Sequence, residues 1–169
     1  MKKLLFLAAA FVGLSAMAQQ KPDEVVKLNT EKYDFGKIKQ GTPVVTYFTL
    51  TNVSDKPVVI ESAWAGCGCT TPEVSKAPVA PHGTTKVKVG YNAGALGQFN
   101  KDVNIKLAGI AETKVIHITG EVLDTKAFEE YAKTDEYKKS EKARLKKEAE
   151  DAKADKKAAK KAKGNVATK

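Results

Sequence analysis

The chain has 169 residues, a net charge of +9, two cysteines and one tryptophan. The charge is uneven: residues 19–125 carry 12 basic and 11 acidic side chains, whereas residues 126–169 carry 15 basic and 9 acidic ones. Because the apolar-rich body is nearly neutral, these counts exclude a folded surface built to bind nucleic acid, and we expect no nucleic-acid partner. Residues 19–125 have the length of one domain, and we expect 126–169 to be a tail.

Residues 1–18 are typical of a secretory signal peptide. Lys2 and Lys3 supply the positive start, residues 4–14 the apolar run, and the small residues ending at Ala18 the cleavage pattern. The apolar run is too short to span a bilayer, and no cysteine follows it for lipid attachment. We therefore expect an exported protein that is periplasmic or secreted after cleavage near Ala18. An uncleaved interfacial helix is the alternative.

Short runs of alternating apolar residues, separated by turn residues, fill the chain after the signal. They predict strands at Val25–Leu28, Tyr33–Ile38, Val44–Thr51, Val58–Trp64, Thr85–Tyr91, 102–107 and Lys114–Val122. The stretch through Pro72, Pro78 and Pro81 is expected to be a loop. About seven strands joined by polar turns favour an all-β, antiparallel β-sandwich, with a closed barrel as the lesser alternative.

The same alternation predicts which face of each strand is buried. In the third run Val44, Thr46, Phe48 and Leu50 share one face, and Val45, Tyr47 and Thr49 share the other. In the fourth run Val58, Ile60, Ser62 and Trp64 are expected on one side. Buried positions later in the chain are predicted at Val87, Val89, Tyr91, Val103, Ile105, Leu107, Ile116, Ile118 and Val122.

Both cysteines lie in Cys67-Gly68-Cys69, directly after the strand that carries Trp64. In an oxidising compartment a disulfide between them is the first expectation. So small a ring stabilises the fold only modestly, because the entropy removed from the unfolded chain grows with loop length. We therefore favour a structural pair that shapes a binding loop.

Four neighbours are assigned the same loop-shaping role: Trp64, Gly66, Gly68 and Thr70. The two glycines are expected to remove Cβ clashes and to allow positive φ, which a tightly bent chain requires. The thiol pair and these four residues are the candidate site. No catalytic residue and no cofactor are assigned.

Two other functions for Cys67 and Cys69 remain open. A strained disulfide is easily reduced, which permits thiol–disulfide exchange, although no Lys, Arg or His flanks the pair to lower a thiol pKa. Paired thiolates also suit Cu(I), or Zn(II) with His82 and His117 as further ligands. The ordinary interpretation of the two histidines is a solvated turn residue and a surface strand residue, so no metal is assigned.

Sequence signatures of the common enzyme classes are absent. The chain has no Gly-rich phosphate loop, no Gly-x-Ser-x-Gly turn and no His-Glu-x-x-His pair. Tyr33-Asp34-Phe35-Gly36 resembles the magnesium motif of kinases, but the other kinase elements are missing. We therefore expect a protein that is not an enzyme, unless the cysteine pair has redox activity.

Several short segments together resemble an exported bacterial family catalogued as domain of unknown function 1573. They are Tyr33-Asp34-Phe35-Gly36 with Gly41, Leu50-Thr51-Asn52, Cys67-Gly68-Cys69-Thr70, Pro81-x-Gly83 and Ile118-Thr119-Gly120-Glu121-Val122. The resemblance covers roughly residues 28–122. It implies an immunoglobulin-like sandwich similar to PapD-like and Hydin-type domains, which act as binding or scaffold modules, and it implies no catalytic residues.

The tail is expected to begin with a helix near Lys126, in which Phe128, Tyr131 and Ala132 have helical spacing and Tyr137 extends the contact with the sandwich. Residues 138–163 carry 12 basic and 5 acidic groups and lack an apolar stripe. They predict a frayed helix that becomes disordered by Gly164. Their charge favours contact with anionic envelope surfaces, and a solvated tether is the alternative.

Taken together, the sequence predicts a non-enzymatic, exported module of the cell envelope that recognises a protein or envelope component. Recognition would use either pairing with a strand at a sheet edge or the end loops that carry Cys67 and Cys69. The rival hypothesis is a thiol–disulfide exchange or Cu(I)-handling protein that uses the same two cysteines.

Overall fold

A computed structural model describes residues 20–146, 149–150 and 153. The predicted signal peptide and the expected loss of helix near Gly164 lie outside the described residues. In chain order the elements are α1 (Pro22–Val25), β1 (Val26–Leu28), β2 (Lys32–Lys39), β3 (Val44–Asn52), β4 (Ile60–Ala65), β5 (Thr70–Val74), β6 (Thr84–Tyr91), β7 (Gly97–Leu107), β8 (Thr113–Leu123) and α2 (Thr125–Ala132). Residues 135–146 are also helical.

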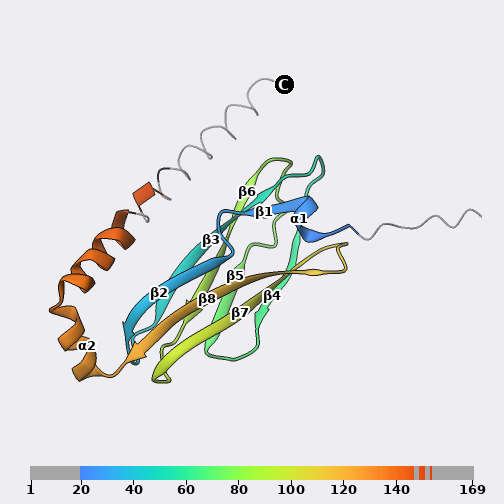
Figure 1. Ribbon diagram of the computed structural model, residues 1–169. Coiled ribbons are helices and arrows are strands. Elements are labelled where there is room, and N and C mark those ends of the chain that lie inside the picture. The colour runs from blue at the N-terminus through green and yellow to red at the C-terminus, as the bar shows by residue number, and fades with distance from the viewer. Residues whose placement is uncertain (1–19, 147–148, 151–152, 154–169) are drawn as a thin grey trace, which may run out of the picture.

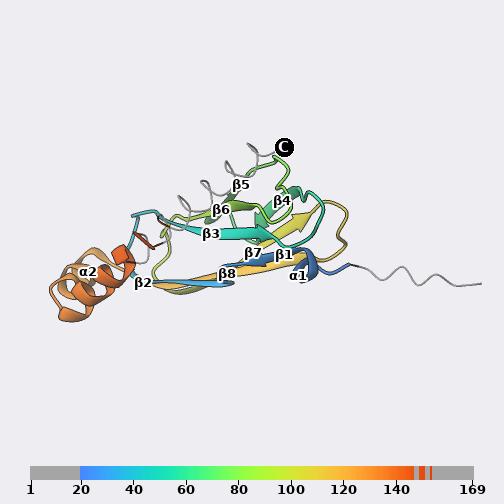
Figure 2. The ribbon, with the colours of Figure 1, turned by 90° about the horizontal axis from the view of Figure 1, so that it is seen from above.

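The strands form two four-stranded sheets that lie face to face as two layers (Figures 1 and 2). The first sheet has the order β1-β3-β6-β5 and the second the order β2-β8-β7-β4. The predicted all-β sandwich is confirmed. Of the strand pairs in the described residues, β2–β8 alone is parallel, because the link 29–31 moves the chain from the edge of the first sheet to the edge of the second.

One strand, β5, was not predicted. Its Pro72 lies in a stretch that was expected to be a loop, yet residues 70–74 pair with β6 in continuous register. Proline cannot donate a ladder hydrogen bond, but β5 is an edge strand, where proline is tolerated. The cysteine pair is therefore followed at once by a strand.

Alternation in β3 follows the prediction and places its apolar face in the core. Phe48 and Leu50 are fully buried, whereas Val45 is 46% and Tyr47 51% exposed. The predicted inward positions of β6, β7 and β8 are likewise buried. Fully burying an aliphatic or aromatic side chain of this size stabilises a fold by about 1.5–3 kcal/mol, so these facing strands are the main source of stability.

The expected sidedness of Trp64 is wrong. A β-bulge interrupts β4, because Ile60 pairs with Leu107 and Ser62 pairs with Lys106, which leaves Glu61 as the extra residue. The carbonyl oxygen of Glu61 accepts a hydrogen bond from the Lys76 ammonium instead. Beyond the bulge the alternation is inverted, and Trp64 is 44% exposed on the outer face.

The closing segment of β8 is held against β2 by a close approach at Gly120. A Cβ there would lie 2.7 Å from Cζ of Phe99 and 2.8 Å from the carbonyl oxygen of Gly36. Gly36 itself has φ +65°, a left-handed conformation that favours glycine. Glycine at these two positions therefore lets β2, β7 and β8 pack tightly.

Within the part of the chain that the structure describes, no helix is long and apolar enough to cross a membrane.

Candidate functional site

The cysteine turn joins two edge strands on the same side of the sandwich. The chain leaves β4 at Ala65 in the second sheet and enters β5 at Thr70 in the first. Cys67 and Cys69 are paired in a disulfide, with their Cα atoms 5.3 Å apart. The predicted thiol pair is thus present, at the place where the chain crosses from one sheet to the other.

Main-chain hydrogen bonds hold this turn at both ends. The Thr70 amide donates to the Cys67 carbonyl at 3.2 Å, and the Asn92 amide donates to the Cys69 carbonyl at 3.0 Å. Ala65 is in register with Val103 of β7 before the turn. The geometry of the turn therefore does not depend on the sulfur–sulfur bond alone.

The Thr70 hydroxyl lies beside the disulfide. The residue is 4% exposed, and its Oγ1 lies 3.8 Å from Sγ of Cys67 and 3.7 Å from Sγ of Cys69. A disulfide sulfur carries no hydrogen, so the hydroxyl is the donor in both contacts. One buried hydroxyl thus faces both sulfur atoms.

The two cysteines have different surroundings. Both are half-buried, but Cys69 packs against the hydrophobic core. Gly66 and Gly68 are exposed, neither has positive φ, and nothing lies within 4 Å of a Cβ at either position. The reasons expected for these glycines, positive φ and clash relief, are therefore wrong. They leave open space around the turn instead.

Cys67 and Cys69 do not gather with His82 and His117 into a metal centre. His82 lies in a turn, with Nε2 3.7 Å from Oδ1 of Asp55. His117 lies on β8, with Nδ1 2.8 Å from Oδ1 of Asp102 on β7. In residues 20–146 and the few described beyond them, no three metal-ligand side chains gather.

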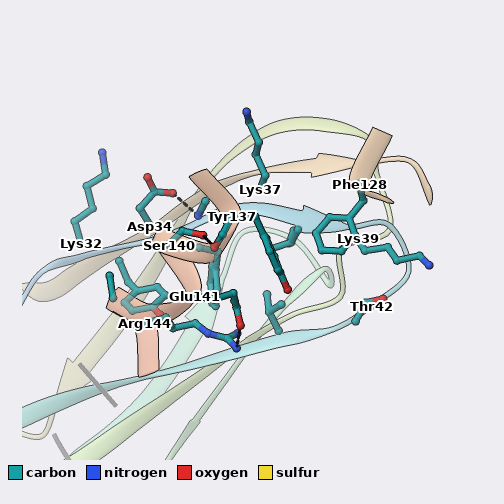
Figure 3. Close-up of a pocket in the computed structure, with 16 residues that line it drawn as sticks. Lys32, Asp34, Lys37, Lys39, Thr42, Phe128, Tyr137, Ser140, Glu141 and Arg144 are labelled. Atoms are coloured by element: carbon teal, nitrogen blue, oxygen red, sulfur yellow. Dashed lines mark hydrogen bonds and ion pairs between the residues drawn. The ribbon is translucent and has the colours of Figure 1, made fainter. Parts of the chain in front are cut away.

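A second candidate site, which the sequence did not reveal, is a groove between β2 and the helical segment 135–146. We call it the β2 groove (Figure 3), and its volume is about 620 Å³. Its apolar lining comes from Tyr33, Phe35, Ile38, Val44, Phe128 and Tyr137. Its charged residues are Lys32, Lys37, Lys39, Arg144, Asp34 and Glu141. The Lys37 ammonium is bound to Glu136, which does not line the groove, and Arg144 pairs with Glu141.

The outer wall of the groove begins with α2, the helix that the spacing of Phe128 and Tyr131 predicted. Asp124 caps this helix, since its Oδ1 accepts a hydrogen bond from the Ala127 amide at 2.8 Å. Phe128, Tyr131 and Tyr137 pack edge to face, with ring centres 5.5–6.3 Å apart. This aromatic cluster lets the chain bend after α2 and return along β2 as residues 135–146 (Figures 1 and 3).

Comparison with solved structures identifies the kind of fold. The PapD-like domain 7 of human CEP192 is 12% identical with a TM-score of 0.50, and the match covers 74% of this chain and 99% of that one. A protein of unknown function from Porphyromonas gingivalis W83 is 17% identical (TM-score 0.50), with 57% of this chain and 46% of that one covered. The VesB protease of Vibrio cholerae is 16% identical (TM-score 0.50), with coverages of 60% and 33%.

At these identities the likeness shows the fold alone, and the chain spans less than half of the Porphyromonas and Vibrio chains. The class is an immunoglobulin-like, PapD-like β-sandwich. The chain belongs to the family described as "Protein of unknown function (DUF1573)", whose model matches residues 26–122. The resemblance seen in the sequence is thereby confirmed. A search among curated proteins found no match.

Proposed function

We propose that this protein is an exported binding module of the cell envelope that accepts an extended segment of another envelope protein beside β3. The observation that carries the proposal is an incomplete sheet edge. On one side β3 pairs with β6 from Val44 to Thr51, but on the other it pairs with β1 only from Leu50 to Asn52. In the described residues, β3 has no partner strand beside positions 44–48 on that side.

The open edge offers main-chain groups for pairing. Thr49 directs its amide and carbonyl towards β1, because its carbonyl accepts from the Asn29 amide at 3.0 Å and its amide donates to Oδ1 of Asn29 at 2.9 Å. Hydrogen-bonding direction alternates along a strand, so Val45 and Tyr47 present their main-chain groups on the same side. An added strand there would complete the first sheet, as in recognition by β-strand addition.

The β2 groove lies at this opening. Eight consecutive residues of β2 line it, from Lys32 to Lys39, together with Val44 at the start of β3. A pocket over one face of a strand would contact alternate residues only, so this groove follows the strand edge. Its apolar floor suits alternate side chains of an extended peptide, and Lys32 and Lys39 in its lining suit a peptide that also carries acidic residues.

Export and the role of the tail belong to the same proposal. The signal-like residues 1–18 support delivery to the envelope. The charge of residues 138–163 supports a peripheral contact between the tail and anionic envelope surfaces. N-terminal sequencing of envelope-fraction protein should then begin at Gln19.

Site-specific photocrosslinking tests the binding mode. A photoreactive phenylalanine analogue replaces Phe35, Val44 or Tyr137, one at a time, in cells that make the full chain. All three groove positions should yield an adduct with the same envelope protein, and glutamate at Lys32 and Lys39 should abolish it. Trp64, on the opposite edge, is the matched position: an adduct confined to Trp64 would move recognition to the cysteine turn and contradict the groove.

A further inference from the structure

The disulfide contributes little to holding its own turn. Hydrogen bonds from the Thr70 and Asn92 amides already hold the carbonyls of Cys67 and Cys69, and β4 and β5 fix the ends. A crosslink between residues two apart in sequence also removes little entropy from the unfolded chain. Stability therefore does not account for this sulfur–sulfur bond.

The flanking glycines have no role inside the fold either. Gly66 and Gly68 adopt negative φ, and a Cβ at either would meet nothing within 4 Å. What their missing side chains leave free is the approach to the disulfide from outside. This points to chemistry with another molecule.

The two sulfur atoms differ in the way that exchange requires. Cys69 packs against the core, so an incoming group has freer access to Cys67. The buried Thr70 hydroxyl lies within 3.8 Å of both sulfurs, and it can direct its hydrogen to whichever sulfur becomes negative. The turn thus combines a less sheltered sulfur as the point of attack, a leaving group packed against the core and a donor for the leaving thiolate.

We propose that Cys67–Cys69 is an exchange-active disulfide that oxidises a dithiol of a partner protein. A partner thiolate attacks Sγ of Cys67, and the bond between the two sulfurs of Cys67 and Cys69 breaks. The electron pair of that bond passes to Sγ of Cys69. Cys69 then takes up a proton from solvent, which balances the proton that the partner thiol lost on forming its thiolate. The other thiolate of the same partner then attacks the partner's own sulfur in the mixed disulfide, and Cys67 is released. The partner ends as a disulfide, having lost two electrons and two protons, and Cys67 and Cys69 end as two thiols.

The asymmetry is tested on the full exported chain with its disulfide intact. The protein is treated with reduced glutathione, the thiol that the reaction frees is blocked with an alkylating agent, and mass spectrometry identifies the cysteine that carries glutathione. Cys67 should carry at least about ten times more glutathione than Cys69, because its sulfur is the less sheltered one. Equal amounts on the two cysteines, or more on Cys69, would overturn the proposal.

The role of the hydroxyl is tested by reduction of the wild-type disulfide with dithiothreitol, a small dithiol, with folding followed by circular dichroism. The folded protein should be reduced without loss of its β signal, and Thr70→Val should slow that reduction roughly fivefold, the effect of one hydrogen bond. Thr71→Val, on the exposed face of the same strand, is the matched control and should leave the rate unchanged. A disulfide that resists dithiothreitol until the protein unfolds, or equal rates in the two valine variants, would overturn the assignment.

Discussion

Nζ of Lys37 lies 4.8 Å from the centre of the Tyr131 ring, so a cation on edge strand β2 faces an aromatic ring of the tail helix. The same ammonium lies 3.8 Å from Oε1 of Glu136. Through these two contacts β2 holds the helical tail in place. The tail is therefore a wall of the β2 groove as well as a charged extension.

Lys37→Ala is expected to loosen that wall. A partly exposed cation–π contact is worth about 0.5–1 kcal/mol, so amide hydrogen exchange in residues 135–146 should accelerate about two- to fivefold. Lys86→Ala is the matched control, because Nζ of Lys86 lies 5.4 Å from the Tyr47 ring on the other sheet. Unchanged exchange in the Lys37 variant would show that the tail is held by something else.

Asn52→Ala should destabilise the fold by roughly 2–3 kcal/mol, because it removes three hydrogen bonds that a fully buried side chain makes. The Asn52 amide group donates to the carbonyls of Lys56 at 2.7 Å, Val79 at 3.0 Å and Ala80 at 3.2 Å, and the residue is fully buried. Urea unfolding measures the loss. Asn100→Ala, at an exposed position of β7, is the control, and a similar loss there would contradict this account of Asn52.

Two glycine substitutions should have opposite consequences. Gly120→Ala places a methyl group 2.7 Å from Phe99 and should cost about 1–3 kcal/mol of unfolding free energy. Gly68→Ala meets nothing, and by restricting the unfolded chain it should leave stability unchanged or raise it by about 0.4–1 kcal/mol. Thermal unfolding compares the two. Loss of stability in Gly68→Ala would show that the turn needs its glycine after all.

Alkaline pH should weaken the anchorage of α1 to β8. Burial lowers the pKa of Lys114, but hydrogen bonds to Asp23 and Glu31 outweigh it, so the pKa is raised above its ordinary value. A lysine whose pKa is raised by folding stabilises the folded state fully at pH values below its pKa in the unfolded chain, about 10.4. This stabilisation is lost as the pH rises through the pKa of the folded state. Urea midpoints should therefore fall above that pH, and less steeply in Lys114→Met.

Tyr91 also lowers the stability of the fold at alkaline pH, and its effect must be distinguished from that of Lys114. Burial raises the pKa of its phenol, so its contribution is also lost as pH rises through the folded value. Tyr91→Phe removes this contribution and leaves that of Lys114. If Lys114→Met retains the full alkaline loss while Tyr91→Phe abolishes it, the ion pairs of Lys114 do not contribute to the pH dependence.

Regular alternation predicts sidedness correctly wherever a strand keeps its register, as Phe48 and Tyr47 of β3 show. It fails in β4, because nothing in the residue pattern marks Glu61 as a bulge, and one extra residue moves Trp64 to the outer face. It also fails for β5, because Pro72 signals a loop unless the strand is known to be an edge. Edge position is a property of the sheet, which a local pattern does not contain.

The sequence could predict more of the cysteine turn than of the β2 groove. The Cys67–Cys69 pair and Thr70 are neighbours in the chain, so their association was predictable, but the hydroxyl facing both sulfurs was not. The β2 groove joins Phe35, Val44 and Tyr137, which lie far apart in sequence. The groove exists because β1 is short and the tail folds back. Both features depend on the tertiary structure, so the sequence pattern could not predict them.

The amide exchange of β3 tests strand addition at the β2 groove most directly. Synthetic peptides that tile the photocrosslinked envelope protein are added to the full exported chain, and exchange is followed residue by residue. A peptide that binds the groove should protect the Val45 and Tyr47 amides by about tenfold or more, because each gains an interstrand hydrogen bond, and it should leave Val87 in the core unchanged. Binding with no protection at Val45 and Tyr47, and with new protection at Trp64 and Thr70 instead, would contradict the account.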